Sequence, residues 1–176
     1  ALDKNGSLWS WGSNRNGKLG RNLSFNAQVL SPAQIGTDTD WQDFAVAANH
    51  VIALKKDGSI WSWGDNTAGK LGQGNKSRLS TNHDLYSPKQ VGTDTDWKYV
   101  AASDNNTFAI KEDGTLWGCG INSNNQLTNS PTSGIDVTRL RKIGSDANWV
   151  KVAPGSFHVL AINSNLELYA WGFNSS

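Results

Sequence analysis

Apolar and polar residues alternate along short stretches of this chain, and the same alternating stretch recurs four times. In residues 59–64, Trp61 and Trp63 fall on one face of an extended segment, whereas Ile60 and Ser62 fall on the other. The matching stretches are residues 7–12, 115–120 and 167–172. One face of each extended segment carries bulky side chains, and the other carries one aliphatic and one small side chain. This distribution is typical of strands in sheets that are buried on both faces. Since no window favours an amphipathic helix, the pattern predicts an all-β protein.

The alternating stretches belong to a longer repeat. Trp9, Trp61, Trp117 and Tyr169 hold the same place in successive copies, at spacings of 52, 56 and 52 residues. Repeats of this length are typical of solenoids, propellers and arrays, in which one unit cannot bury its apolar face alone. We therefore expect one domain over residues 1–176, with repeat phases that begin near residues 1, 53, 109 and 161.

Each aromatic pair in the first three copies follows a turn sequence. These are Asn5-Gly6, Asp57-Gly58 and Asp113-Gly114. Asn-Gly and Asp-Gly between strand-like runs predict a β-hairpin with a two-residue type I′ turn, which needs positive φ twice. The fourth copy has Asn165-Leu166 at this place, which predicts a different turn. A further strand is expected before each hairpin, at residues 44–48, 100–102 and 150–153.

The order of signatures in one copy is specific. The second copy reads ALKKDGSIWSWGDNTAGKLG, then SPKQVG, then a tryptophan. This order resembles the regulator-of-chromosome-condensation repeat, which builds seven-bladed β-propellers. The matching residues are Gly64, Asn66, Gly69, Leu71, Gly72, Pro88, Gly92 and Trp97 in the second copy, and Gly12, Asn14, Gly17, Leu19, Gly20, Pro32, Gly36 and Trp41 in the first. The third copy departs from the pattern at Asn125, Thr128 and Leu140.

The resemblance implies β-propeller blades of antiparallel strands that make up roughly half of a seven-bladed ring. The chain has no methionine and starts and stops inside a repeat, so we expect a fragment of a longer propeller. The alternative is self-association, in which two copies complete a ring. The sequence GTDTDW, which occurs twice, resembles sequences of bacterial members of the family.

Composition narrows the classes of function. Lysines and arginines number 16 against 15 acidic residues, without a basic block, which argues against a nucleic-acid surface. The single cysteine, Cys119, excludes an intrachain disulfide framework and stands where other copies have tryptophan. We also expect no membrane span, metal, cofactor or catalytic residue. The compartment stays undetermined.

Several recurring residues resemble functional motifs, yet the repeat predicts structural roles for them. Gly64, Gly69 and Lys70 match the spacing of a phosphate-binding loop, but no Ser or Thr follows the lysine and no helix can begin there. A blade loop is the better interpretation. The acidic pairs Asp38/Asp40 and Asp94/Asp96 are expected to form local turns.

Two more sets of recurring residues favour the same interpretation. His50, Asn106 and His158 share one repeat position and are expected to bond to backbone between blades. The nine tryptophans occupy fixed repeat phases, so the core is the expected place for all of them.

The clearest departure from the repeat is the loop between Gly72 and Pro88, which carries four extra residues in the second copy. Insertions in repeat proteins fall in loops, and loops on rigid scaffolds carry binding. The candidate contact residues are Lys76, Arg78, His83, Asp84 and Tyr86. The alternative is that this loop has changed in length and sequence without gaining a function.

The resemblance implies a non-enzymatic module that binds another protein. One alternative is guanine-nucleotide exchange on a Ran-like small GTPase, although no long inserted wedge is visible. Another is a binder like the β-lactamase-inhibiting propellers. A carbohydrate-binding or cell-surface module would need exposed aromatics outside the repeat phase, for which Phe25 and Tyr86 are available.

Overall fold

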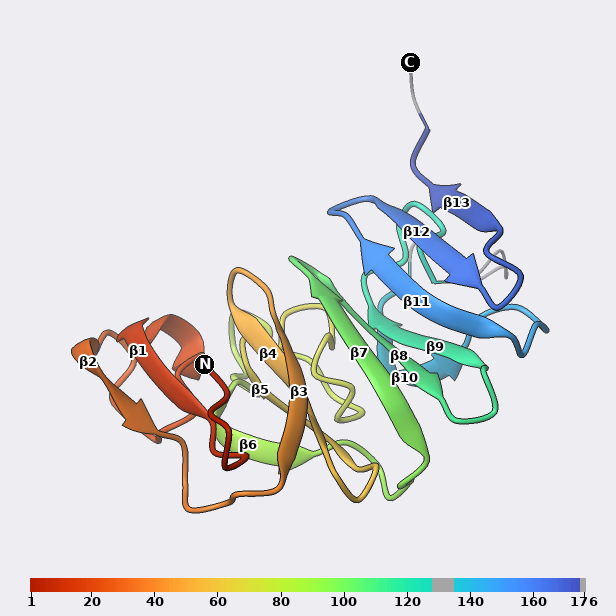
Figure 1. Cartoon of the computed structure of the whole chain (residues 1–176). Helices are drawn as coiled ribbons and strands as arrows, with labels where there is room; N and C mark the ends of the chain where they lie inside the picture. Colours follow the sequence, from red (N-terminus) through yellow and green to blue (C-terminus); the bar gives the residue numbers. More distant parts are fainter. Residues whose placement is uncertain (128–134, 175–176) are drawn as a thin grey trace.

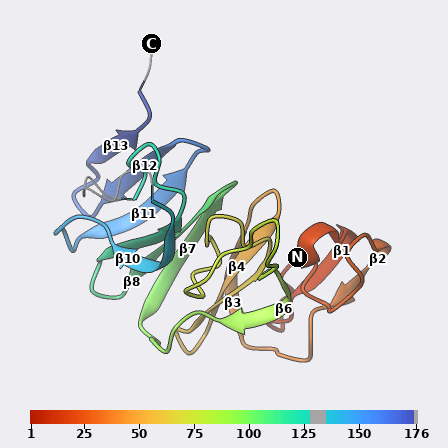
Figure 2. The same ribbon diagram turned by 180° about the vertical axis from the view of Figure 1, so that it is seen from behind.

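The computed structural model describes residues 1–127 and 135–174. The described strands form four antiparallel sheets that stand side by side in a curved row (Figure 1). The first blade, β1 and β2, lies at one end of the row, and the last blade with the C-terminus lies at the other, as the view from behind also shows (Figure 2). Each sheet is one blade of a propeller, and together they make a partial ring.

The chain fills the blades in sequence order. The first blade pairs β1 (Trp9–Ser13) with β2 (Gln28–Gln34), and a 3-10 turn, η1 (Arg15–Gly17), follows β1. The second contains β3 (Trp41–Val46), β4 (His50–Lys55), β5 (Ile60–Gly64) and β6 (Leu85–Gln90). The third contains β7 (Trp97–Ser103), β8 (Asn106–Lys111), β9 (Leu116–Gly120) and β10 (Val137–Lys142). The fourth contains β11 (Trp149–Pro154), β12 (His158–Asn163) and β13 (Leu168–Gly172).

This arrangement confirms the predicted all-β propeller blades. The strands expected before each hairpin overlap β3, β7 and β11, and each of these begins at a tryptophan. Thr128, one of the departures in the third copy, lies outside the described residues.

The core lies between the blades, since both faces of a middle blade are covered. The cluster between the second and third blades contains Ile52, Leu54, Ile60, Val91, Trp97, Val100 and Ala109, all buried. A similar cluster lies at each of the other two junctions. Large and small residues alternate across these junctions, as the period-two pattern predicts.

The expectation that all nine tryptophans lie in the core was wrong. Four are buried, namely Trp41, Trp63, Trp97 and Trp149, four are partly buried, namely Trp9, Trp61, Trp117 and Trp171, and Trp11 is exposed. Trp63 is buried in the cluster between the first and second blades, and its indole N–H donates to the Lys18 carbonyl of the preceding blade, at 3.1 Å. Trp171 makes the same contact with the Gln126 carbonyl at 2.8 Å. Trp11 holds this repeat position in the first blade, makes no such contact with the described residues, and is 49% exposed.

The hairpin turns are present, but their type differs from the prediction. In the second blade the N–H of Gly58 donates to the Lys55 carbonyl, and the N–H of Lys55 donates to the Ser59 carbonyl. Only Gly58 has positive φ in this turn, at +79°. The geometry is a type I turn followed by a left-handed residue, not the type I′ turn. Asp57 stabilises it by accepting hydrogen bonds from both the N–H and the hydroxyl of Ser59.

The turn glycine also forms the junction to the next blade. The carbonyl of Gly58 accepts a hydrogen bond from the N–H of Trp97, at 3.1 Å. A Cβ on Gly58 would lie 2.1 Å from the Thr95 carbonyl oxygen. The position therefore requires glycine for two reasons, its positive φ and this close approach.

The fourth blade keeps the same turn without glycine, contrary to the expected change of turn. Leu166 takes the left-handed conformation at φ +65°, and its N–H donates to the Asn163 carbonyl as in the other blades. Its side chain is 85% exposed, so burial does not offset the backbone strain.

We predict that Leu166→Gly raises the free energy of unfolding by about 1 kcal/mol, because glycine removes the left-handed strain. Urea denaturation followed by fluorescence measures the change. Asn165→Gly is the matched control, since Asn165 lacks a positive φ and should lose about 0.5–1 kcal/mol. An unchanged or lower stability for Leu166→Gly would contradict the strain argument.

Candidate functional site

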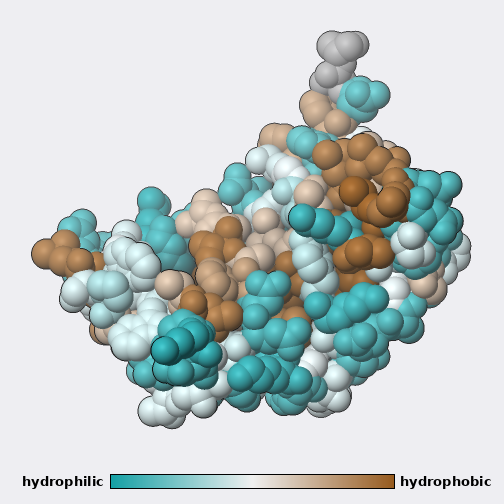
Figure 3. All heavy atoms as spheres, viewed as in Figure 1, coloured by the Kyte–Doolittle hydropathy of each residue, from teal (hydrophilic) through white to brown (hydrophobic). Residues whose placement is uncertain are grey.

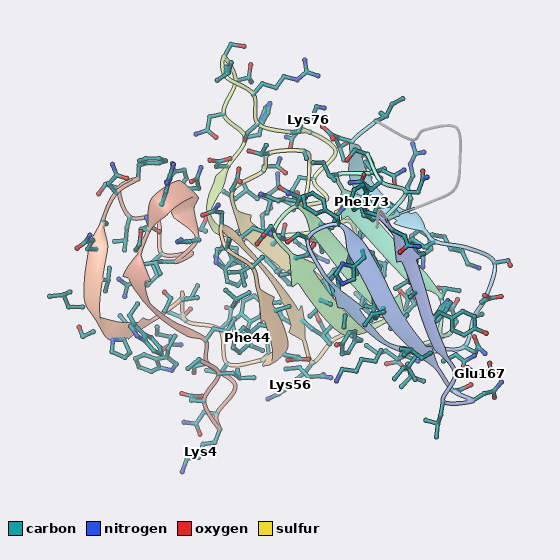
Figure 4. The ribbon with its side chains drawn as sticks, turned by 90° about the horizontal axis from the view of Figure 1, so that it is seen from above. Lys4, Phe44, Lys56, Lys76, Glu167 and Phe173 are labelled. Atoms are coloured by element: carbon teal, nitrogen blue, oxygen red, sulfur yellow. The ribbon has the colours of Figure 1, made fainter. Side chains whose placement is uncertain are left out.

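The candidate residues gather around the long connection between β5 and β6 in the second blade. Lys76 lies at the end of the blades opposite to the hairpin turns that carry Lys4, Lys56 and Glu167 (Figure 4). Four of the candidates lie in this connection, and Tyr86 lies on β6. The structure therefore brings all five candidates to one part of the molecule.

Asp84 holds the connection in place. One carboxylate oxygen accepts hydrogen bonds from the backbone N–H of Asn66 at 2.9 Å and from the Ser77 hydroxyl at 2.6 Å. The other accepts a bond from the side-chain amide of Asn16, in the first blade, at 2.8 Å. Asp84 thus ties the connection both to its own start and to the preceding blade.

Lys76 ties the connection to the blade that follows. Its ammonium group lies 2.5 Å from a carboxylate oxygen of Asp136, just before β10, and both side chains are about a quarter exposed. The N–H of Gly74 also donates to the Thr138 carbonyl at 2.7 Å. Asp136 was not among the sequence candidates, because only the stacking of blades brings it near Lys76.

Tyr86 and His83 are half-buried at the base of the connection. The carbonyl of Tyr86 accepts a hydrogen bond from the N–H of Asn22 at 2.7 Å, and the Tyr86 ring packs closely on Gly17. His83 is held by its own N–H, which donates to the Ser77 hydroxyl at 2.9 Å.

The tip of the connection is different, because its side chains point to solvent. Arg78 and Thr81 pair through two backbone hydrogen bonds, at 2.8 and 3.2 Å, so the tip is a small hairpin. Arg78 is exposed, and Leu79 is fully exposed. Leu79 was missed in the sequence, where a lone leucine within a polar loop was the available signal. A cation and an aliphatic side chain thus stand together on a fixed support.

In the loop that resembles a phosphate-binding motif, the lysine and the second glycine are occupied by contacts with other protein groups. The ammonium group of Lys70 is buried, 2.7 Å from an Asp65 carboxylate oxygen, and donates to the Asp104 carbonyl at 3.0 Å. A Cβ on Gly69 would lie 2.6 Å from the Thr138 side chain, so the loop packs directly on β10. The blade-loop interpretation therefore agrees with these contacts.

The acidic pairs were wrongly expected to form only local turns. Asp38 and Asp40 lie 2.7 and 3.1 Å from the ammonium group of Lys55, which sits 4.8 Å from the ring centres of Trp41 and Trp61. Burial alone would lower the pKa of Lys55, but the bonds to the two carboxylates outweigh it and raise the pKa. The third blade repeats this arrangement around Lys111.

His50, Asn106 and His158 share one repeat position but lie in three different environments. The prediction that all three bond to backbone between blades was therefore wrong. His50 is fully buried and its Nε2 lies 2.9 Å from the Thr107 hydroxyl in the next blade. Asn106 donates to the Ile121 carbonyl within its own blade, and His158 is exposed. Burial, and secondarily the Lys70 cation, lower the pKa of His50 from 6.5 to about 3.

Two kinds of feature are missing from residues 1–127 and 135–174. These residues contain no cluster of three or more side chains able to hold a metal ion. They also contain no helix with the length and apolar character needed to cross a bilayer.

The repeated antiparallel blades, two of them four-stranded, and their junctions define the chain as a β-propeller scaffold. The model of the regulator of chromosome condensation (RCC1) repeat matches residues 5–54 and 57–110, and a second model of that repeat matches residues 42–70 and 97–126. The chain therefore belongs to the RCC1 repeat family, as the sequence predicted.

Curated relatives share the repeat over almost the whole chain. The human E3 ubiquitin-protein ligase HERC2 is 27% identical over 180 residues, which cover 99% of this chain and 4% of HERC2. The guanine nucleotide exchange factor SRM1 of Saccharomyces cerevisiae is 27% identical over 191 residues, which cover 99% of this chain and 39% of SRM1. The chain thus spans only a minor part of these relatives.

Solved structures have the same fold. Human WBSCR16 superposes with a TM-score of 0.82 at 23% identity, over 97% of this chain and 43% of that one. A structure of yeast RCC1 (Prp20) bound to Kap60 superposes with a TM-score of 0.80 at 26% identity, over 98% of this chain and 41% of the matched one.

We predict that His50 makes stability fall in acid. The unfolded chain takes up a proton at His50 as the pH falls through 6.5, whereas the folded chain resists until about pH 3. The contribution is thus complete above pH 6.5 and is lost progressively toward pH 3. His50→Asn, which introduces the residue of the third blade, should reduce the slope by up to about 1.4 kcal/mol per pH unit.

Urea denaturation between pH 7 and pH 4 measures this slope. His158→Asn is the matched control, because His158 is exposed and should leave the slope unchanged. Equal slopes for His50→Asn and the unsubstituted chain would show that His50 is not the group responsible.

Proposed function

We propose that this chain is a non-enzymatic protein-binding module whose partner contacts the tip of the connection between β5 and β6. The observation that carries the proposal is a solvent-exposed tip on a firmly held base. Arg78 and Leu79 are exposed at the tip, while Asp84 and Lys76 join its base to the blades on either side.

The physical argument concerns the entropy of binding. A partner that orders a mobile loop loses part of the binding free energy, whereas a loop already held in place avoids that loss. Arginine with an adjacent apolar side chain also suits an interface, since arginine is enriched at energetically important contacts. His83 and Tyr86 belong to the support of the tip in this proposal.

Guanine-nucleotide exchange is the second candidate function. It is favoured by the similarity to SRM1, which is named as a guanine nucleotide exchange factor, over almost the whole chain. The chain covers 39% of SRM1, so exchange by this part alone is a separate hypothesis. The activities named for HERC2 and other larger relatives belong to those proteins.

The remaining alternatives have weaker support. Binding to β-lactamases would use the same loops and would give the same dependence on the tip. Carbohydrate binding would need exposed aromatics outside the repeat phase. Phe25 is 44% exposed and meets this requirement, whereas Tyr86 is half-buried against the first blade. Membership of a longer propeller and bacterial origin stay predictions.

We predict that Arg78→Ala combined with Leu79→Ser weakens partner binding at least about tenfold, as expected for central contacts of an interface. Proteins captured by the immobilised chain are identified by mass spectrometry, and their affinities are then measured by calorimetry. Lys89→Ala is the matched control, since it removes an exposed cation from β6 of the same blade.

A second variant separates contact from support. Asp84→Ala removes the anchor but leaves the tip sequence intact, so binding should weaken while trypsin cleavage after Arg78 becomes faster. Equal affinity for the tip variant, the Lys89 variant and the unsubstituted chain would eliminate the tip as the binding site.

For the exchange hypothesis, we predict that the chain accelerates release of a fluorescent GDP analogue from a Ran-like GTPase in a saturable manner. Where a longer parent protein is identified, the matching experiment uses that protein under the same conditions. Acceleration by the parent but not by this chain would place exchange outside residues 1–176. Acceleration by neither would remove exchange as a function.

A further inference from the structure

A lysine side chain is enclosed by two aromatic rings and two carboxylates in the second blade. The ammonium group of Lys55 lies 2.7 Å from an oxygen of Asp38 and 3.1 Å from an oxygen of Asp40. It also lies 4.8 Å from the ring centres of Trp41 and Trp61. We call this set of groups the lysine cage. The carboxylates accept the ammonium N–H groups and the ring faces attract the charge.

The third blade repeats the lysine cage around Lys111. The ammonium group lies 2.7 and 3.0 Å from oxygens of Asp94 and Asp96. The ring centres of Trp97 and Trp117 lie at 4.8 and 5.1 Å. In both blades these groups come from the connection before the first strand and from the first three strands. The fourth blade has all of these segments.

The cage is open to solvent in the two four-stranded blades. The side chains of Lys55 and Lys111 are only 9 and 12% exposed, whereas the aspartates around them are 48–52% exposed. A cation can therefore reach these groups from outside even where a blade has its fourth strand and a following neighbour.

The fourth blade has the rings of the cage but not its lysine. Asn163 ends β12 at the place where Lys55 ends β4 and Lys111 ends β8. Trp149 and Tyr169 still meet edge to face at 80°, the angle between the two rings of the second blade. Their ring centres lie 5.1 Å apart, against 6.0 Å in the second blade.

Asn163 does not replace the ammonium group, because its side chain is bound within the hairpin turn. Its Oδ1 accepts hydrogen bonds from the backbone N–H groups of Asn165 and Glu167, both at 3.0 Å. Its side-chain N–H donates to the Glu167 carboxylate at 2.6 Å. The amide is also neutral, so it brings no charge to the rings.

The charge around these rings is more negative than in the other cages. Asp146 stands three residues before Trp149, as Asp38 does before Trp41, and Glu167 adds a carboxylate 3.3 Å from the Tyr169 hydroxyl. The Glu167 charge and, to a smaller extent, the Asp146 charge raise the pKa of Tyr169. Within residues 1–127 and 135–174, neither carboxylate forms an ion pair.

We propose that the fourth blade binds the ammonium group of an unmodified lysine side chain from a second polypeptide. Trp149 and Tyr169 attract its charge, and Asp146 accepts its N–H groups. The ligand is inferred from the other two cages, where the same kinds of group hold a lysine of this chain.

The position of the site agrees with a charged ligand. Hydrophilic residues cover most of the lower and right-hand rim of the row, where the hairpin turns lie (Figure 3). Glu167 marks this end of the fourth blade, opposite to the end that carries Lys76 (Figure 4). The site is therefore separate from the connection between β5 and β6 and does not depend on the proposed function.

Nuclear magnetic resonance detects weak binding of a small probe, Nα-acetyl-lysine methylamide, to the isotope-labelled chain. We expect saturable shifts of the Trp149 indole N–H and of the Tyr169 amide. The Nε-acetylated probe should cause none, because it has no charge. The Nε-trimethylated probe should bind more weakly, because it cannot donate to Asp146. Absence of saturable shifts, equal binding of the acetylated probe or tighter binding of the trimethylated probe would each overturn the proposal.

Two variants test the site from the side of the protein. Asn163→Lys supplies the ammonium group from the chain itself, so the lysine probe should bind at least about tenfold more weakly. Asp146→Asn should weaken binding about threefold, the effect of losing a partly exposed ion pair. Asp94→Asn is the matched control and should leave the affinity unchanged, because Lys111 already occupies that cage.

The aspartate comparison keeps the proposal falsifiable if Asn163→Lys disturbs the hairpin turn. Circular dichroism checks the folding of each variant. Equal affinity of the Asp146→Asn and Asp94→Asn variants for the lysine probe would overturn the proposal. Undiminished binding to a folded Asn163→Lys variant would overturn it as well.

Discussion

The structure depends on the burial of sheet faces between neighbouring blades. A single blade would leave residues such as Ile52 and Ile60 in water, but each is fully buried once the next blade is in place. The junction is positioned by a backbone bond from Trp97 to the turn glycine Gly58, whose lack of a side chain permits the close approach. Most recurring residues of the chain serve this one contact surface.

Charged residues serve the same architecture. Lys55 is held between two tryptophan rings and two carboxylates, so its cation is compensated where it is largely removed from water. Lys70 is compensated by Asp65 within a loop that packs on the next blade. These lysines have structural partners, so the recurring Gly-Lys spacing and the acidic pairs have structural roles in the blades.

Departures from the repeat are therefore the more informative positions for function. The longer connection in the second blade presents Arg78 and Leu79 beyond what blade packing needs.

The sequence by itself determined the all-β class, the repeat phase and the family, because period-two alternation and glycine turns are local properties that recur in register. It also located the unusual loop. Tertiary structure decided which loop residues are anchors and which are exposed, since Asp84 and Lys76 bond to Asn16 and Asp136 from other blades. It likewise decided the exposure of Trp11 and the partners of Asp38, because burial and ion pairing depend on residues that only folding brings together.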